Sequence, residues 1–279
     1  MSTIAFRFDV DTHKCIRDGV GHLLALSQKY EAPFTFFLNT GRSIDLGDSL
    51  HTLRHPSHEE VAPHLSARAK LGNADYLFCA LCNPSLMRYR TQIQALLDSP
   101  CETGLHGGRN HALWARDFSQ WDDARIEEEL DFAIANLRRL QPDYQPCGFA
   151  SPCWVSSHAF SALLKRKGFR YSADFHQYGA QNPVRRDGPL PVIGVNLLGE
   201  PGGVAWFETC VAQGLSTEEI VCRTLAFIES HPLTVLYDHP YFAGCDPRAL
   251  AAIEGVLKAA RQAGHTFVTL REEVGGAHA

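Results

Sequence analysis

The stretch Phe6-Arg7-Phe8-Asp9-Val10-Asp11-Thr12-His13 lies close to the N-terminus and decides how the rest of the chain is interpreted. Residues 4–8 predict a short apolar strand with one polar break, and this strand runs directly into two carboxylates. Side chains alternate between the two faces of a strand, so Asp9 and Asp11 should point the same way. Two like charges in one place disfavour each other unless a cation lies beside them. The pattern indicates a cation site or, as the simpler alternative, a turn in which an aspartate caps a helix.

The composition favours one large α/β domain. The chain has 279 residues, of which 45% are hydrophobic and 20% are charged, which is ordinary for a single α/β barrel. The net charge is −5 and the longest basic run is Lys165-Arg166-Lys167, which argues against a nucleic-acid partner. We expect no transmembrane segment and no signal peptide, because no apolar run is long enough and the chain starts with a strand. Nine scattered cysteines fit a cytoplasmic protein that keeps them as thiols.

Strand-like and helix-like segments alternate along the chain. Strands are predicted at residues 33–38, 101–105, 146–150, 169–174, 190–198, 204–209, 234–237 and 266–270, and helices at 17–30, 85–99, 122–140, 216–230 and 246–264. This alternation predicts a parallel sheet wrapped by helices, and about eight such units favour a barrel over an open sheet. We predict a single domain over residues 1–274, with an excursion at 39–84 and a short tail at 275–279.

Polar side chains follow several of the predicted strands, at the end of a barrel where reacting groups gather. They are Asp9, Asp11, His106, His111, Trp154, Asp174 and His239. One carboxylate and two histidines can hold a catalytic divalent metal and leave a position open for water. The second carboxylate and the last histidine are then available as base and acid. Each residue also has a simpler structural explanation, but their shared location favours one common site.

In the order of its motifs, the chain resembles the polysaccharide deacetylase superfamily, also called the NodB-homology or carbohydrate esterase family four proteins. Within it, the chain most resembles the formamidoarabinose-phosphoundecaprenol deformylases of lipid A modification. The likeness covers nearly the whole chain, except that the excursion at 39–84 does not obviously match. The residues that carry it are Phe8-Asp9-Val10-Asp11-Thr12, Arg17-Asp18-Gly19-Val20, Gly104-Leu105-His106 through His111-Ala112, Trp121-Asp122, Trp154, Tyr171-Ser172-Ala173-Asp174, Tyr237-Asp238-His239, Gly244 and Phe267-Val268-Thr269-Leu270.

The resemblance implies a distorted β/α barrel of seven or eight strands and a role for each polar residue. Asp9 would be the general base, and Asp11, His106 and a second histidine would bind the metal. His239 would be the general acid, with Asp174 behind it as the residue that orients it. The metal would be divalent, with zinc expected first and Co²⁺, Ni²⁺, Mn²⁺ or Fe²⁺ as alternatives.

The substrate side of the site is predicted to include Cys153, Trp154 and Tyr237, and a backbone N–H near Cys153 or Trp154 could stabilise an oxyanion. Two features depart from the family pattern. The family's second metal histidine lies four residues after the first, where this chain has Asn110, so either His111 reaches the metal through an irregular turn or Asn110 binds it. Ala150-Ser151 stands where many relatives have an arginine that orients the base, so any such arginine must come from elsewhere.

The resemblance implies an amidohydrolase that removes an acetyl or formyl group from a small or lipid-linked amino sugar. One alternative is hydrolysis of a non-sugar linear or cyclic amide, because one barrel can support several C–N cleavages. Another is a catalytically weakened barrel that binds sugars, which the imperfect metal motif favours. The sequence leaves the oligomeric state open.

Overall fold

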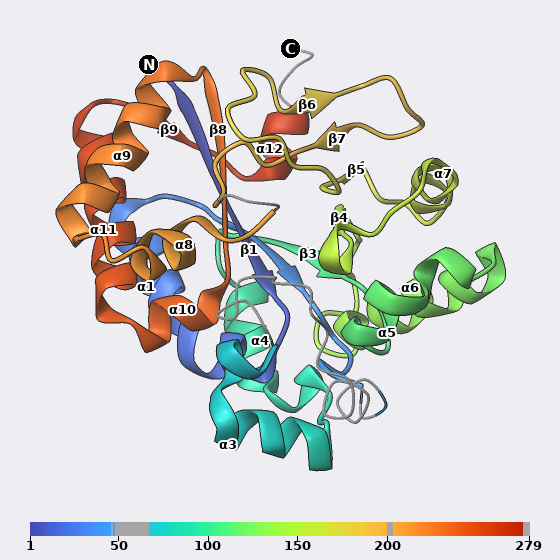
Figure 1. The fold of residues 1–279 in the computed structure, drawn as a ribbon. Helices are drawn as coiled ribbons and strands as arrows, with labels where there is room; N and C mark the ends of the chain where they lie inside the picture. Colours follow the sequence, from blue (N-terminus) through green and yellow to red (C-terminus); the bar gives the residue numbers. More distant parts are fainter. Residues whose placement is uncertain (46, 48–66, 200–202, 276–279) are drawn as a thin grey trace.

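The computed structural model describes the chain except for residues 46, 48–66, 200–202 and 276–279 (Figure 1). The strands are β1 (Thr3–Val10), β2 (Thr35–Leu38), β3 (Glu102–His106), β4 (Gly148–Ala150), β5 (Tyr171–Ser172), β6 (Val184–Arg185), β7 (Val192–Ile193), β8 (Leu233–Asp238) and β9 (Thr266–Phe267). The α-helices are α1 (Gly21–Tyr30), α3 (Ala67–Cys82), α4 (Arg90–Leu97), α5 (His111–Asp117), α6 (Asp123–Arg138), α7 (His158–Arg166), α8 (Trp206–Ala212), α9 (Thr217–Ser230), α10 (Pro240–Cys245), α11 (Pro247–Gln262) and α12 (Leu270–Gly275). Short π or 3₁₀ turns are η1 (Cys15–Val20), η3 (Leu86–Arg88), η4 (Phe118–Gln120) and η5 (Pro152–Trp154).

The strands form one curled sheet in the order β6-β7-β5-β4-β3-β2-β1-β8, with β9 added beside β1. The pairs are parallel except β6 with β7. Isolated parallel bridges join His176 to Val195 and Leu197 to Leu236, so the chain beyond β7 reaches across to β8. The sheet therefore curls towards closure, and the predicted distorted α/β barrel is confirmed.

Helices cover the outside of this sheet (Figure 1). Helices α1, α8, α9, α10 and α11 lie on the side of β8, and α5, α6 and α7 lie on the side of β4. Among the described residues, no helix combines the length and apolar character needed to cross a membrane. The excursion predicted at 39–84 and the tail at 275–279 lie partly outside the described residues, and the single-domain boundary at residue 274 stays a prediction.

Strand β1 shows why the sequence places chemistry inside the barrel. Phe6 and Phe8 belong to the core beneath the helices, where Phe6 lies 5.2 Å from the ring of Phe34. The alternate residue Ala5 belongs to the inner core, and Arg7 and Asp9 share its face. These five residues of β1 are all at most 3% exposed. The alternation that buries the phenylalanines against the helices therefore turns Arg7 and Asp9 into the barrel.

One predicted element was wrong in type, and a second was predicted too long. Residues 204–209 were expected to form a strand, but helix α8 begins at Trp206, and Trp206 through Val211 are all buried. A short run that is buried on all sides has no periodicity that separates helix from strand. The strand predicted at 266–270 ends at Phe267, and α12 begins at Leu270.

Candidate active site

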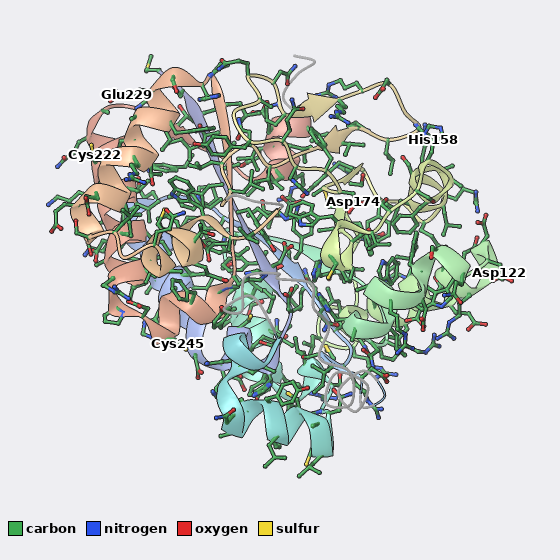
Figure 2. The ribbon with its side chains drawn as sticks, in the orientation of Figure 1. Asp122, His158, Asp174, Cys222, Glu229 and Cys245 are labelled. Atoms are coloured by element: carbon green, nitrogen blue, oxygen red, sulfur yellow. The ribbon has the colours of Figure 1, made fainter. Side chains whose placement is uncertain are left out.

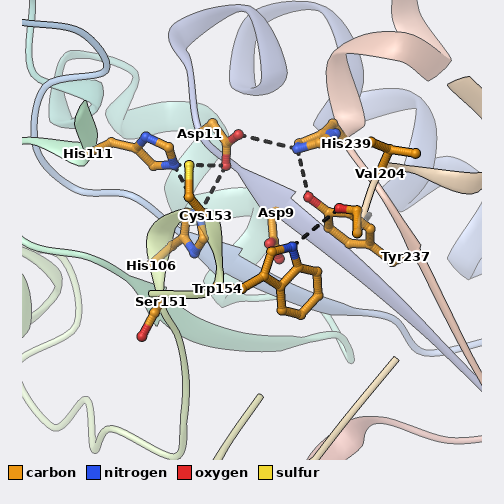
Figure 3. Close-up of a pocket in the computed structure, with 11 residues that line it drawn as sticks. Asp9, Asp11, His106, His111, Ser151, Cys153, Trp154, Val204, Tyr237 and His239 are labelled. Carbon is orange, nitrogen blue, oxygen red and sulfur yellow. Dashed lines mark hydrogen bonds and ion pairs between the residues drawn. The ribbon is translucent and has the colours of Figure 1, made fainter. Parts of the chain in front are cut away.

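A cavity of about 240 Å³ lies at the carboxyl end of β1 (Figure 3). It is lined by Asp9, Asp11, His106, His111, Ser151, Cys153, Trp154, Gly203, Val204, Tyr237 and His239. The structure therefore brings together all the predicted site residues except Asp174. The register of the parallel strands explains this, because His106 pairs with Ala150 and Phe8 pairs with Asp238, so the strand ends are level.

Asp11, His106 and His111 form a compact ligand cluster. Asp11 Oδ1 lies 3.1 Å from His106 Nε2 and 3.6 Å from His111 Nε2, and the two ring nitrogens are 3.2 Å apart. His106 Nδ1 lies 2.8 Å from the carbonyl oxygen of Ala150, which can only accept a hydrogen bond, so Nδ1 carries the proton. A neutral His106 ring then presents a lone pair at Nε2, which is the arrangement found behind metal-binding histidines.

These three residues fit a divalent metal. Asp11 Oδ1 is buried and, by strict geometry, no described residue donates a hydrogen bond to it. Burial would raise the pKa of Asp11, but the neighbouring His111 and His239 hold that pKa well below its usual value. Acceptor atoms this close repel one another unless protons or a cation lie between them. One carboxylate oxygen and two imidazole nitrogens suit zinc and leave coordination positions open.

Asn110 and His111, the two candidates for the third metal ligand, have different surroundings. Asn110 caps α5, because its Oδ1 accepts hydrogen bonds from the backbone N–H groups of Ala112 and Leu113 at 3.0 and 3.4 Å. Its amide nitrogen donates to the carbonyl oxygen of Ile44 at 3.2 Å. The side chain of Asn110 is therefore used for structure, and His111, the first residue of α5, faces the cluster.

Asp9 lies beside this cluster and is held by Arg7. Arg7 donates from Nε to Asp9 Oδ1 at 2.9 Å and from Nη2 to Asp9 Oδ2 at 2.7 Å, and its Nη1 donates to the carbonyl oxygen of Ala173 at 2.5 Å. The guanidinium carbon lies 5.1, 4.2 and 5.3 Å from the ring centres of Phe37, Trp154 and Tyr237. Arg7 is not among the site residues predicted from the sequence. The alternation that aligns Asp9 with Asp11 nevertheless places Arg7 on the same face.

His239 lies on the opposite side of Asp11. Its Nε2 is 3.2 Å from Asp11 Oδ2 and 3.0 Å from the hydroxyl of Tyr237, and its Nδ1 is 2.7 Å from Glu208 Oε1. Glu208 comes from α8 and is 4% exposed. A buried carboxylate at Nδ1 fixes the ring orientation and directs Nε2 into the cavity.

The prediction that Asp174 lies behind His239 is wrong, because Glu208 occupies that place. Asp174 accepts hydrogen bonds from the backbone N–H of Ser151 at 2.6 Å and from the hydroxyl of Ser156 at 3.2 Å. Figure 2 shows it on the side of the molecule that carries β4 and α7. Burial raises the pKa of Asp174. Asp174 does follow a strand, as expected, but its position along the strand does not show which neighbouring loop its carboxylate contacts.

The residues predicted to contact the substrate line the cavity, and two of them also form hydrogen bonds with other residues of its wall. Tyr237 is buried, and burial raises the pKa of its hydroxyl well above the usual value, so the hydroxyl stays protonated 3.0 Å from His239 Nε2. The indole N–H of Trp154 donates to the carbonyl oxygen of Gly203 at 3.2 Å. The backbone N–H of Trp154 donates to the carbonyl oxygen of Ser151 at 3.1 Å. The Trp154 N–H, one of the two backbone groups considered for an oxyanion role, is therefore already used within this turn.

Comparison with known proteins supports the same assignment of fold. A probable polysaccharide deacetylase of Pseudomonas aeruginosa superposes with a TM-score of 0.62 at 16% identity, covering 98% of this chain and 89% of that chain. The chain has the polysaccharide deacetylase fold. An allantoinase superposes almost as well, with a TM-score of 0.60 at 15% identity over 99% of this chain and 91% of that chain. The fold alone therefore does not identify which C–N bond is cleaved.

A curated relative is more specific. It is a probable 4-deoxy-4-formamido-L-arabinose-phosphoundecaprenol deformylase of Shewanella sediminis, 27% identical over 177 residues. The match covers 62% of this chain and 57% of that protein, so the chain matches only a little over half of its length. No family model matches the chain. The resemblance to the superfamily seen in the sequence is thus confirmed at the level of the fold.

Proposed function

We propose that this protein is a divalent-metal-dependent amidohydrolase that removes a formyl or acetyl group from the nitrogen of an amino sugar. The observation that carries the proposal is the convergence of Asp11, His106 and His111, with Asp9 on one side of them and His239 on the other. The deformylase relative supports a small or lipid-linked amino sugar as substrate. We propose zinc as the metal, because mixed nitrogen and oxygen ligands suit it, and the cytoplasm as the location, because nine scattered cysteines are typical of a reducing compartment.

Asp11, His106 and His111 would hold the ion, which supplies Lewis acidity towards the amide carbonyl and towards water. Asp9 is placed to accept the proton of the attacking water. A carboxylate has about four lone-pair positions, and Arg7 uses two of those on Asp9, so others remain for that proton. The water oxygen forms a bond to the carbonyl carbon as Asp9 takes its proton.

His239 is placed to complete the cleavage. The C–N bond breaks with its electron pair going to nitrogen, and that nitrogen needs a proton to leave as an amine. Carboxylates lie near both ring nitrogens of His239, Glu208 at Nδ1 and Asp11 at Nε2, and both stabilise the cationic ring. The proton passes from Nε2 to the amine, and the products are formate or acetate and the free amino sugar.

Hydrolysis assays test this proposal directly. N-formyl and N-acetyl amino sugars, free and as lipid-linked phosphates, should be hydrolysed after addition of Zn²⁺, and chelation should abolish turnover. His239→Ala should slow amide cleavage far more than cleavage of an activated ester, whose leaving group needs no proton. Turnover of cyclic ureides alone would support the non-sugar amidase instead. Sugar binding with metal bound but no hydrolysis would identify a binding protein.

A further inference from the structure

One buried carboxylate outside the cavity holds the turn between His106 and His111. Glu129 on α6 is 1% exposed. Its Oε2 accepts a hydrogen bond from the backbone N–H of Arg109 at 2.5 Å. Its Oε1 lies 2.6 Å from Arg125 Nη2 and 3.5 Å from Arg109 Nη1. The carboxylate is therefore balanced by two arginines while it binds the backbone of the turn.

The turn is built to lie directly on Glu129. Gly107 has a φ of +77°, a conformation that glycine adopts without strain. A side chain at Gly108 would collide with Glu129 Oε2, so only glycine lets the backbone come this close. On the other side, Arg42 N–H donates to Arg109 O and His111 N–H donates to Arg42 O, both at 2.9 Å. Hydrogen bonds therefore hold the turn on both sides, to α6 and to the chain that follows β2. We call this arrangement the clamp.

This clamp explains how a histidine five residues after His106 meets the same ligand cluster. On a regular helix, residues five apart point about 140° away from each other. Here residues 107–110 are not helical, and His111 is the first residue of α5. The path of the turn therefore fixes where His111 Nε2 lies. Metal–ligand distances tolerate only about 0.2 Å, so a small movement of this turn matters.

We propose that Glu129 is a positioning residue of the metal site: it fixes the turn that carries His111 to Asp11 and His106. The proposal rests on the proposed function, because it requires a divalent ion at those three residues. Without Glu129, the backbone N–H of Arg109 loses its acceptor, and the guanidinium groups of Arg109 and Arg125 lose one of their two carboxylate partners. The turn then has to move to satisfy these groups, and His111 moves with it.

Metal affinity measures this role without relying on activity. Metal-free protein is titrated with Zn²⁺ in competition with a chromophoric chelator. Glu129→Ala should weaken binding about 10- to 100-fold, the loss typical for groups that orient metal ligands. Glu129→Gln keeps an acceptor oxygen and should lose less. Glu128→Ala is the matched control, because it removes the same charge one residue away, from a side chain that is 62% exposed, and it should bind Zn²⁺ as the wild type does.

A second variant covers the case in which Glu129→Ala does not fold. Gly108→Ala places a methyl group against the carboxylate and should also weaken Zn²⁺ binding. The visible spectrum of bound Co²⁺ should change in these variants, because the coordination of His111 is disturbed. Wild-type affinity and an unchanged Co²⁺ spectrum in Gly108→Ala, or in Glu129→Ala where that variant folds, would overturn the role of Glu129. A wild-type protein that binds no divalent ion would instead refute the proposed function.

Discussion

Replacing Arg7 by methionine should destabilise the protein strongly, because it leaves the carboxylate of Asp9 buried and unpaired. Methionine is unbranched and apolar, so it can keep contact with the aromatic rings that surround the Arg7 side chain. Arg7 is 0% exposed and Asp9 is 3% exposed, so water from the cavity can replace the lost partner only in part. Removing one partner of a buried ion pair typically costs about 3–5 kcal/mol of the free energy of unfolding.

A double-mutant cycle separates the ion pair from packing. Asp9→Asn alone leaves Arg7 without its carboxylate and should also be costly. The double variant Arg7→Met with Asp9→Asn has no buried charge at either position. It should therefore be much more stable than the sum of the two single losses predicts. The difference is the interaction energy of the pair.

Urea denaturation is the assay, with the free energy of unfolding obtained by linear extrapolation. Tryptophan fluorescence is a suitable signal, because the Trp154 ring lies 4.2 Å from the Arg7 guanidinium. Arg17→Met is the control: Arg17 pairs with Asp18 and Asp75 but is 41% exposed, so its loss should cost no more than about 1 kcal/mol. A loss below about 1 kcal/mol in Arg7→Met, or strict additivity in the cycle, would refute the reasoning.

Three further predictions use the same structure. His111→Ala should release bound Zn²⁺, whereas Asn110→Ala should keep it and lose about 1 kcal/mol of stability as a missing helix cap; elemental analysis and urea titration separate the two. Glu208→Gln should lower kcat and shift the basic limb of the pH–rate profile, whereas Asp174→Asn should leave that limb at its wild-type pH. If the basic limb lies at the same pH in both variants, Glu208 does not orient His239. Burial and the neighbouring Glu208 raise the pKa of Asp238 to about 7 in the folded protein, whereas an aspartate in the unfolded chain has a pKa of about 4. Between these two pH values the folded protein binds more protons than the unfolded one. Stability should therefore fall from about pH 4 to pH 7, and Asp238→Asn should reduce that slope in denaturation curves.

The sequence was sufficient for those parts of the site that follow from local alternation. Asp9 in β1 and Asp11 just beyond its end line the same cavity, as a period of two predicts from the residues alone. His106 and His239 follow apolar strands, and parallel strands bring their carboxyl ends to one edge. Arg7 obeys the same period, so it could have been assigned to the barrel interior by the argument already applied to Asp9.

The partner of His239 could not be found in this way, because it depends on contacts between distant segments. Glu208 lies 31 residues before His239, in a run of buried residues that reads equally well as a strand. Asp174 looked like the better candidate because it ends a predicted strand. Its carboxylate instead holds the backbone of Ser151 in the loop after β4. Choosing between these two carboxylates requires the arrangement of the loops above the barrel, which no local sequence pattern records.

Two supports of the proposed site come from positions that the family pattern does not predict. A motif records residue types at fixed spacings, whereas chemistry needs only certain atoms at certain places. Here the guanidinium beside the proposed base comes from β1, two residues before Asp9, and not from the loop after β4. The second histidine of the ligand cluster lies five residues after the first instead of four, at the end of a turn that is hydrogen-bonded to Glu129. If both supports are needed, restoring the common spacing by Asn110→His with His111→Ala should not restore Zn²⁺ affinity, because position 110 faces Ile44 and the start of α5 rather than Asp11. Wild-type Zn²⁺ affinity in that double variant would show that spacing, and not the clamped turn, determines the site.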